Sequence, residues 1–242
     1  MAHTLYIGNK NYSSWSLRGW LLVRASGIAF DEKVISLNDN EHASVYQQFS
    51  PSGLVPCLVN DGDGSTSPAT VVWDSLAIAE YLAEHQRALW PADPRARAWA
   101  RSISAEMHSG FRALRSEMTM CVRERVDVRP WSSGLQKDID RVVAIWAETR
   151  RQFGPKANHG GAAAGDGGLL FGGFTAADAM YGPVAFRFRT YGVEPGGAAG
   201  DYLRALLDHP YMREWESAAL AETERVEADE PRVIYRDKIR AA

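Results

Sequence analysis

Two adjacent serines, Ser13 and Ser14, stand in the stretch "NYSSWSLRGW" (residues 11–20), directly before residues whose spacing predicts a helix. The first turn of a helix has unpaired backbone N–H groups and the positive end of the helix dipole, which together favour a bound anion. A serine hydroxyl at this junction either caps the helix or donates a hydrogen bond to such an anion. The pair is therefore a candidate site for an anionic group, with the division of roles between the two serines left open.

Two further polar motifs follow in the same part of the chain. In "GLVPCLV" (residues 53–59), Val55-Pro56 begins a strand, where a proline is tolerated and can be cis. The residue before such a proline can present its backbone edge to an extended peptide. In "WDSLAIAEYL" (residues 73–82), Asp74 and Ser75 precede a helix and can cap it or bind a small polar ligand.

Other chemistries fit the sequence poorly. It lacks the Gly-x-Ser-x-Gly motif and the histidine and acid partners of a serine hydrolase. Its six histidines are scattered, and Cys57 and Cys121 are far apart, so neither a metal site nor a disulfide framework is indicated. We expect no bound metal and two reduced, buried cysteines.

The elements needed to position these residues alternate between strand and helix up to about residue 85. This order predicts a mixed four-stranded sheet covered by helices. The expected strands are residues 4–8, 30–37, 55–60 and 70–74, and the expected helices begin at Ser14, Glu41 and Asp74 and end near Ser26, Phe49 and His85.

Beyond the proline-punctuated stretch at residues 89–98, only helical patterns remain. The clearest runs from residue 133 to 153, with an apolar stripe typical of core packing. Thr175 and Asp178 form an acidic variant of a capping box at the start of another helix, and Pro183 predicts a kink within it. One or two helices, interrupted at residues 209–210, are expected from 201 to 221. We therefore place one domain at 1–86 and an all-helical domain at 94–242.

Composition restricts the partners. The 27 Lys and Arg residues against 30 Asp and Glu give a net charge of −3, which does not favour nucleic acid or an anionic membrane. No apolar run approaches the roughly 18 residues of a membrane span, and no secretion signal begins the chain. We expect a cytoplasmic protein.

The order and spacing of "SSWSLR", "GLVPCLV", "WDSLAIAEYL" and "FTAADAMYGP" resemble the cytosolic glutathione S-transferases of the serine type, in particular bacterial and zeta-like members. The resemblance implies an α/β thioredoxin-like N-terminal domain that holds glutathione as co-substrate. It also implies an all-α C-terminal domain that completes a pocket for a small electrophile. Members of the family are commonly homodimers.

Carried over by motif, the resemblance gives each candidate residue a role. Ser13 or Ser14 would donate a hydrogen bond to the glutathione sulfur, which together with the helix dipole lowers a thiol pKa by about one to two units. Val55 would hold the cysteinyl backbone, with Pro56 cis. Asp74 and Ser75 would bind the γ-glutamyl end. The family's structural residues would be Arg18, which supports the serine junction, and the capping pair Thr175 and Asp178.

The chain also departs from the zeta pattern. Trp15 replaces its cysteine, and Leu54 stands at a glutathione-binding position where many members have lysine or glutamine. The glycyl carboxylate therefore needs another partner, for which His42 or Lys10 are candidates. The arginine of zeta members would fall near Thr190, with Arg189 beside it. Serines in place of Cys-x-x-Cys predict no disulfide exchange.

Three hypotheses remain. The first is a transferase that adds glutathione to a small electrophile. The second is an isomerase of the maleylacetoacetate type, which uses glutathione as a recycled nucleophile on a cis-enediacid. The third is a non-catalytic module with the same fold. The electrophile is unidentified, because aromatic residues of the helical domain are more typical of core than of pocket: Trp99, Phe111, Tyr181 and Phe186.

Overall fold

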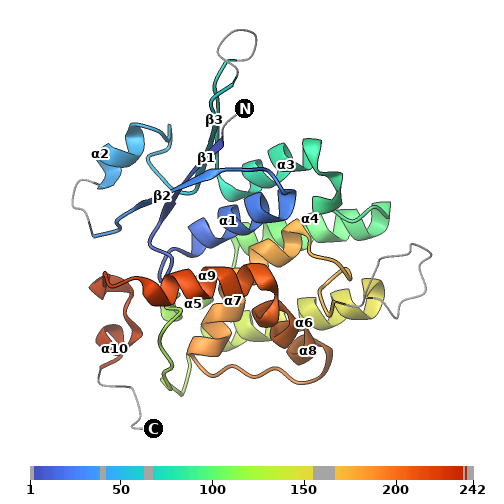
Figure 1. The fold of residues 1–242 in the computed structure, drawn as a ribbon. Coiled ribbons are helices and arrows are strands. Elements are labelled where there is room, and N and C mark those ends of the chain that lie inside the picture. The colour runs from blue at the N-terminus through green and yellow to red at the C-terminus, as the bar shows by residue number, and fades with distance from the viewer. Residues whose placement is uncertain (1–2, 39–41, 63–67, 155–166, 237, 239–242) are drawn as a thin grey trace.

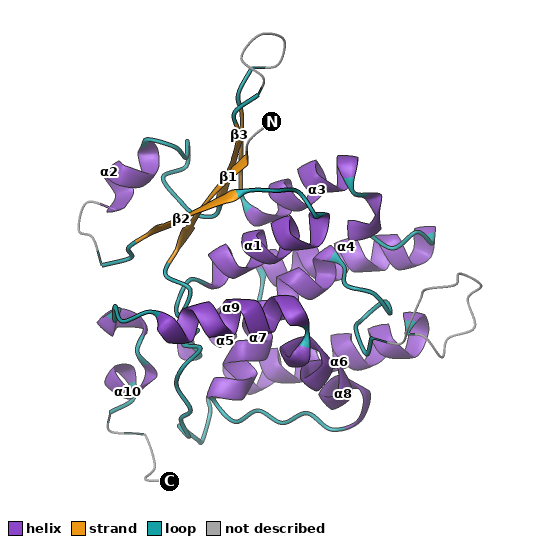
Figure 2. Ribbon diagram, in the orientation of Figure 1, coloured by secondary structure: helices purple, strands orange, loops and turns teal. Residues whose placement is uncertain are grey.

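A computed structural model describes residues 3–38, 42–62, 68–154, 167–236 and 238, with the backbone alone for residues 42 and 43. Four strands form one sheet in the order β2-β1-β3-β4 (Figures 1 and 2). β1 pairs parallel with β2, whereas β1–β3 and β3–β4 are antiparallel. The predicted mixed sheet is therefore confirmed. The strands are β1 (His3–Gly8), β2 (Asp31–Ile35), β3 (Cys57–Asn60) and β4 (Thr70–Trp73).

Three helices accompany the sheet: α1 (Ser14–Ser26), α2 (His42–Gln47) and α3 (Ser75–His85). α1 and α3 pack against each other, whereas α2 stands apart from them beyond β2 (Figure 1). Leu5 and Ile7 of β1 are fully buried, while the ring of Tyr6, between them, stacks on Phe49 at a centroid distance of 3.9 Å. The alternation of β1 thus gives the sheet two covered faces.

Beyond β4 the described elements of regular structure are all helices, joined by loops, apart from isolated bridges within residues 169–173 (Figure 2). The predicted helical domain is therefore confirmed, although the boundary between 86 and 94 stays a prediction. The helices are η1 (Arg87–Leu89), α4 (Pro94–Ser109), α5 (Arg112–Glu117), α6 (Ser133–Phe153), α7 (Ala176–Thr190), α8 (Gly197–Asp208), α9 (Pro210–Ala221), η2 (Glu227–Asp229) and α10 (Pro231–Ile234).

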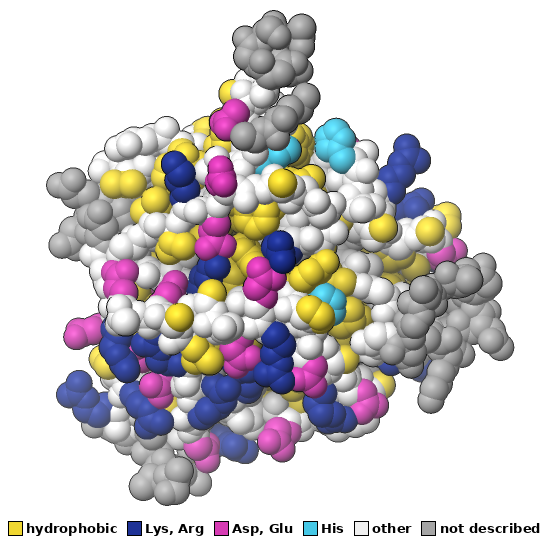
Figure 3. All heavy atoms as spheres, viewed as in Figure 1, with side chains coloured by type: hydrophobic (Ala, Val, Ile, Leu, Met, Phe, Trp, Pro, Cys, Tyr) yellow, Lys and Arg dark blue, Asp and Glu magenta, His cyan; other side chains and the backbone are white. Residues whose placement is uncertain are grey.

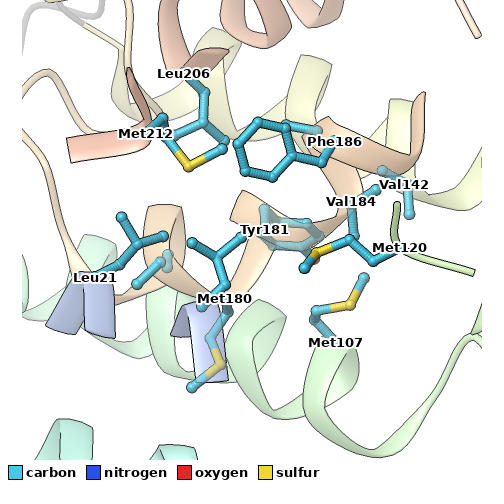
Figure 4. Close-up of a cluster of buried hydrophobic side chains, with 14 of the residues drawn as sticks. Leu21, Met107, Met120, Val142, Met180, Tyr181, Val184, Phe186, Leu206 and Met212 are labelled. Carbon is cyan, nitrogen blue, oxygen red and sulfur yellow. The ribbon is translucent and has the colours of Figure 1, made fainter. Parts of the chain in front are cut away.

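Helix α7 lies at the centre of the molecule and joins the two domains. It packs against α1, and a Cβ added at Gly182 would stand 2.7 Å from Leu21 Cδ1. Glycine therefore permits this close approach, and a larger residue would have to displace the Leu21 side chain. Figure 4 shows Leu21 of α1 beside the side chains of Tyr181, Phe186 and Met212 in one apolar cluster. The serine-bearing helix is thus packed directly on the helical domain.

The α7 capping pair is present as predicted. The backbone N–H and the hydroxyl of Thr175 both donate to Asp178 Oδ2 at 2.8 Å, and the N–H of Leu170 donates to Oδ1 at 3.3 Å. Asp178 is fully buried, and this burial raises the pKa of its carboxyl to about 6. α7 continues through Pro183, and the kink expected there stays a prediction.

Small differences from the predicted elements have local causes. α8 begins at Gly197, four residues earlier than expected, because a glycine-rich sequence conceals helical periodicity. Phe153, at the end of α6, is only half-buried, unlike Leu135, Ile139, Val142 and Trp146 of the same stripe. The expected interruption between α8 and α9 occurs at His209. Most of the glycine-rich stretch at residues 157–168 lies outside the described residues.

The face drawn in Figure 3 carries basic and acidic side chains close together over its lower half, where the C-terminal helices lie. Arg213 of α9, for example, pairs with Asp208 and Glu216. The charges on this face are therefore largely mixed rather than separated by sign. No described helix has the length and apolar character needed to cross a bilayer.

Candidate active site

Ser13 is the N-cap of α1, and its hydroxyl forms hydrogen bonds within the first turn of this helix. It donates to Ser16 Oγ at 2.7 Å, and Ser16 Oγ in turn accepts the N–H of Gly8 at 2.9 Å. The Ser16 N–H also points to Ser13 Oγ, at 3.4 Å. This small network joins the end of β1 to the first turn of α1 and closes the turn between them.

Ser14 is the first residue of α1 and differs from its neighbour. Both serines are 8% exposed and line the same cavity, but within the described part of the chain the Ser14 hydroxyl has no hydrogen-bond partner, whereas that of Ser13 is bonded to Ser16. One hydroxyl of the serine pair is therefore engaged in hydrogen bonds within the protein, and the other is unpaired in the described part of the chain.

The cavity at Ser14, called here the serine cavity, has a volume of about 410 Å³. Its wall on the sheet-domain side includes Tyr12, Leu54 and Val55. The opposite wall comes from the helical domain and includes Arg115 and Arg187. The serine cavity thus lies where the two domains meet.

A second cavity of about 340 Å³, called here the Asp74 cavity, is lined by Pro56, Trp73, Asp74 and Ser75. Both cavities share three lining residues: Trp15, Leu54 and Val55. They therefore adjoin and form one extended cleft at the side of the sheet where β1 and β4 end and β3 begins. The cleft brings together the three sequence motifs that we singled out, at Ser14, Val55 and Asp74.

The Val55-Pro56 peptide bond is cis. Pro56 rests against α1, because a Cβ added at Gly19 would lie 2.6 Å from Pro56 Cβ. The following residue, Cys57, is buried in β3, and burial raises the pKa of its thiol to about 11. Cys57 is therefore a core residue held in its thiol form, as the sequence predicted.

Asp74 caps α3 from an unusual backbone conformation, with φ of 73°. Its Oδ1 accepts the N–H of Leu76 at 2.8 Å, and its Oδ2 lies 2.7 Å from His108 Nε2 of α4. The Ser75 hydroxyl is buried without a hydrogen-bond partner among the described residues. A helix N-terminus, a carboxylate and an unpaired hydroxyl therefore adjoin in this cavity.

Trp15 stands between the two cavities and is held by cations. The guanidinium of Arg18 lies 4.4 Å from its ring centroid and that of Arg115 lies 4.8 Å away, while the ring of His108 meets it edge-on at 5.3 Å. Such cation–π contacts stabilise an aromatic ring in one orientation. The residue that replaces the zeta cysteine is thus part of the cleft wall.

Arg18 is 1% exposed, and its Nε and Nη1 have no hydrogen-bond partner in the described part of the chain. Burial, followed by the charges of Arg115 and Arg187, lowers the pKa of this guanidinium well below its ordinary value. Arg18 packs against the ring of Trp15, and its expected support of the serine junction stays a prediction.

Arg115 and Arg187 are the functional candidates that sequence reasoning missed. Arg187 Nε donates to the Met118 carbonyl at 2.6 Å, and burial lowers the pKa of Arg187 to about 10. Arg115 Nε donates to the Gly110 carbonyl at 2.9 Å, and burial lowers its pKa as well. Asp229 also lines the serine cavity, and burial raises the pKa of its carboxyl. Two guanidinium groups thus face a cavity with one carboxyl.

The expected arginine position of zeta members does not reach this cavity. The Thr190 hydroxyl donates to the Cys121 carbonyl at 2.8 Å in the interior, and Arg189 pairs with Glu216 at 2.5 Å. Arg187 lies nearly one helical turn earlier on α7 and lines the cavity instead. The difference arises because helix packing determines which side chains of α7 point into the cavity. Counting residues from a sequence motif does not give this orientation.

His42 and Lys10 were the residues expected to bind the glycyl carboxylate of glutathione, and the structure describes only one of their side chains. The side chain of His42 lies outside the described residues. Lys10 Nζ pairs with Glu32 at 2.7 Å and lies over the rings of Trp20 and Trp215, so it lines neither cavity. The aromatic residues that we expected in the core line neither cavity either: Trp99, Phe111, Tyr181 and Phe186. No group of three potential metal ligands occurs among the described residues.

A thioredoxin-like sheet domain with an appended helical domain, and a cleft between a helix N-terminus and a cis-proline strand, defines the class of this protein. The chain belongs to the glutathione S-transferase family. The family model for the glutathione S-transferase N-terminal domain matches residues 12–85, and that for the C-terminal domain matches residues 127–217. Together they cover more than half of the chain.

Relatives agree with this assignment. A probable maleylacetoacetate isomerase of Caenorhabditis elegans is 33% identical over 112 residues, which cover 46% of this chain and 48% of that protein. The match thus spans about half the length of this relative.

Two solved structures share the fold. A glutathione transferase homologue from Burkholderia, with bound glutathione, has 21% identity and a TM-score of 0.63, covering 92% of this chain and 100% of the other. A maleylacetoacetate isomerase from Anaeromyxobacter dehalogenans, also with bound glutathione, has 22% identity and a TM-score of 0.62, covering 92% and 98%.

Proposed function

We propose that this protein binds glutathione in the extended cleft and activates its thiol through Ser14. The observation that carries this proposal is the Ser14 hydroxyl, which lines the cavity at the N-terminus of α1 and has no protein partner in the described part of the chain. Ser13 serves the helix end instead, through Ser16. Glutathione bound to the two family structures supports the same ligand here.

The other cleft residues suit the remaining parts of glutathione. The backbone of Val55, before the cis-proline, offers hydrogen-bonding groups to the cysteinyl residue. The Ser75 hydroxyl and the N-terminus of α3 suit the γ-glutamyl carboxylate, and the Asp74 carboxylate suits its ammonium group. Leu54 offers only apolar contact beside them. Each of these groups adjoins the Asp74 cavity.

The chemistry follows from the electrostatics of the helix end. A hydroxyl hydrogen bond and the positive end of α1 both favour thiolate over thiol, so they lower the thiol pKa. A reduction of about one to two units corresponds to about 1.4–2.8 kcal/mol. The thiolate sulfur then attacks an electrophilic carbon of a second substrate in the serine cavity. For a substrate with a leaving group, that group departs with its electron pair.

A second candidate reaction is cis–trans isomerisation of an enediacid, in which glutathione adds and is then expelled. Arg115 and Arg187 favour this candidate, since two guanidinium groups in one cavity suit a substrate with carboxylates. The maleylacetoacetate isomerase names of two relatives point the same way. The transferase and isomerase candidates share the thiolate and differ only in whether glutathione stays on the product.

The test is a comparison of wild type with Ser14→Ala and Ser13→Ala. Glutathione conjugation to an aryl halide should fall at least about tenfold in Ser14→Ala, as expected for loss of a hydrogen bond to a charged group. Turnover of a cis-enediacid without consumption of glutathione would select the isomerase. If Ser14→Ala retains the full rate, the role proposed for Ser14 fails. If wild type turns over neither substrate, a non-catalytic binding module is the better account.

Assembly and location are part of the same proposal. We propose a homodimer, as membership of the glutathione S-transferase family suggests. A dimer mass in light scattering supports it, and a monomer mass contradicts it. We propose a cytoplasmic location, which suits two free cysteines, Cys57 and Cys121.

A further inference from the structure

The loop that leads into the serines, residues 9–13, connects β1 to α1 and is buried throughout. We call it the serine loop. The chain after α9, residues 222–235, is called here the C-terminal strap. The end of α9 lies beside the connection from β1 to α1 (Figure 1), although the two are separated by about two hundred residues in sequence. The strap had no role in our sequence predictions.

We propose that Glu222 is a positioning residue, whose carboxylate fixes the serine loop and thereby aims the Ser14 hydroxyl at the glutathione sulfur. Glu222 Oε1 accepts the backbone N–H of Lys10 at 2.6 Å, and Oε2 accepts that of Asn11 at 2.9 Å. A carboxylate that receives two consecutive N–H groups forms charge-assisted hydrogen bonds, which are stronger than neutral ones. This proposal rests on the role of Ser14 proposed above.

Other polar groups of these two loop residues also bond to the helical domain. Trp215 Nε1 of α9 donates to the Lys10 carbonyl at 2.9 Å. The N–H of Val122 donates to the Asn11 carbonyl at 3.1 Å, and that of Arg123 donates to Asn11 Oδ1 at 3.0 Å. The position of the serine loop is therefore set largely by the other domain. Among the described residues, Glu222 is the only acceptor of the Lys10 and Asn11 backbone N–H groups.

The loop transmits this position to the serines through short local bonds. The N–H groups of Tyr12 and Ser13 both donate to the Asn9 carbonyl, at 3.2 and 2.8 Å. Asn9 Nδ2 donates to Glu224 of the strap at 2.9 Å, and the Tyr12 hydroxyl donates to Glu230. The strap therefore bonds to four residues of the loop, Asn9, Lys10, Asn11 and Tyr12, immediately before the first turn of α1.

Glu222 lines neither cavity, so it acts on the reaction only through the loop. Its own place is fixed because Arg123 Nη2 donates to its carbonyl oxygen. Displacements of a fraction of an ångström suffice to weaken a hydrogen bond to a developing or resident charge. Removing the Glu222 carboxylate should therefore impair thiolate formation more than glutathione binding, whose other contacts lie at Val55 and the Asp74 cavity.

The test compares Glu222→Gln with Glu227→Gln, a control that removes one carboxylate from an exposed residue of the same strap. In Glu222→Gln we expect the thiol pKa of bound glutathione to rise by about half to one unit, and kcat to fall about three- to tenfold at neutral pH. The KM for glutathione should stay within about twofold, as expected for a positioning role. In Glu227→Gln each of these quantities should match wild type.

A double-mutant cycle with Ser14→Ala separates the possible results. If Glu222 acts through Ser14, adding Glu222→Gln to Ser14→Ala should change the thiol pKa little. Equal effects in both backgrounds, or an unchanged thiol pKa in a folded Glu222→Gln protein, would overturn the inference. If Ser14→Ala itself has no effect, the proposed function fails instead. Should Glu222→Gln not fold, Glu224→Gln, which releases Asn9, provides the same comparison, and no change in its thiol pKa contradicts the inference.

Discussion

Ser13 and Ser16 face each other across the first turn of α1, with their hydroxyl oxygens 2.7 Å apart. Because Ser16 also receives the Gly8 N–H, the pair ties the end of β1 to the start of α1. Both serines line the cavity, but the Ser13 hydroxyl is engaged with Ser16, whereas the Ser14 hydroxyl has no partner in the described part of the chain. This relationship supports the proposal that Ser14, rather than Ser13, provides the hydroxyl for chemistry.

Replacing Ser13 with alanine should reduce stability more than it reduces thiol activation. The change removes the N-cap and the partner of Ser16, and loss of a capping hydroxyl costs about 1 kcal/mol. Chemical denaturation of Ser13→Ala should show this loss in the free energy of unfolding. Its kcat should remain within about threefold of wild type if capping is its main role. A stable Ser13→Ala protein without activity would instead exchange the roles of the two serines.

Replacing Arg187 with glutamine should change substrate preference. The guanidinium lines the serine cavity, so its loss should lower kcat/KM for a carboxylate-bearing electrophile by about 10-fold or more, as for a charge-assisted bond. A neutral aryl halide should lose less than about threefold, since it makes no such bond. Steady-state kinetics with matched charged and uncharged substrates measure the difference. Equal losses for both would show that Arg187 acts only as a structural partner of Met118.

Asp178 should make stability depend on pH in the direction opposite to that of most carboxylates. Its folded pKa is raised by burial to about 6, so the native state takes up a proton that the unfolded chain does not. The contribution is present below the unfolded pKa and is lost as pH rises through about 6. From about pH 7 to about pH 5, wild type should gain roughly 1 kcal/mol relative to Asp178→Asn. Urea titrations at both pH values measure this; a relative loss would contradict it.

Gly19 should be intolerant of alanine because Pro56 occupies the space of a side chain. An added Cβ would lie 2.6 Å from Pro56 Cβ, and such overpacking costs about 1–3 kcal/mol. The displaced Pro56 should carry Val55 with it and raise the KM for glutathione. Gly134→Ala is the matched control, since its Cβ would make only ordinary contacts, with Ala113 Cβ at 3.5 Å and Ser132 Oγ at 3.8 Å. The control should be neutral or stabilising by up to about 1 kcal/mol. An unaffected KM in Gly19→Ala would separate Pro56 from ligand binding.

The parts of the site that were predicted from sequence carry local physical signatures. The Ser13–Ser14 pair precedes a helix, Pro56 begins a strand, and Asp74 stands at a strand-to-helix turn. Each of these features is determined by capping or by backbone restriction within a few residues. The sheet was predictable for the same reason, because strand and helix periodicities alternate clearly before residue 86.

The parts that were missed depend on packing between segments far apart in sequence. Arg115 and Arg187 line the serine cavity and His108 contacts Asp74 because α7 packs against α1, α4 against α7 and α5 against α6. Glu222 reaches the serine loop because α9 ends beside it. From sequence alone, a charged residue on a helix is expected to face solvent, because the positions of the neighbouring helices are unknown. The zeta arginine position was expected near Thr190 and Arg189, rather than at Arg187, for the same reason.

The most direct measurement is the thiol pKa of glutathione bound to the wild-type protein and to Ser14→Ala, followed by the ultraviolet absorbance of the thiolate. The account predicts a pKa about one to two units below that of free glutathione in wild type, and a return of at least about one unit toward the free value in Ser14→Ala. Glutathione should still bind to the variant. The same pKa in both proteins would contradict the central claim that Ser14 activates the thiol.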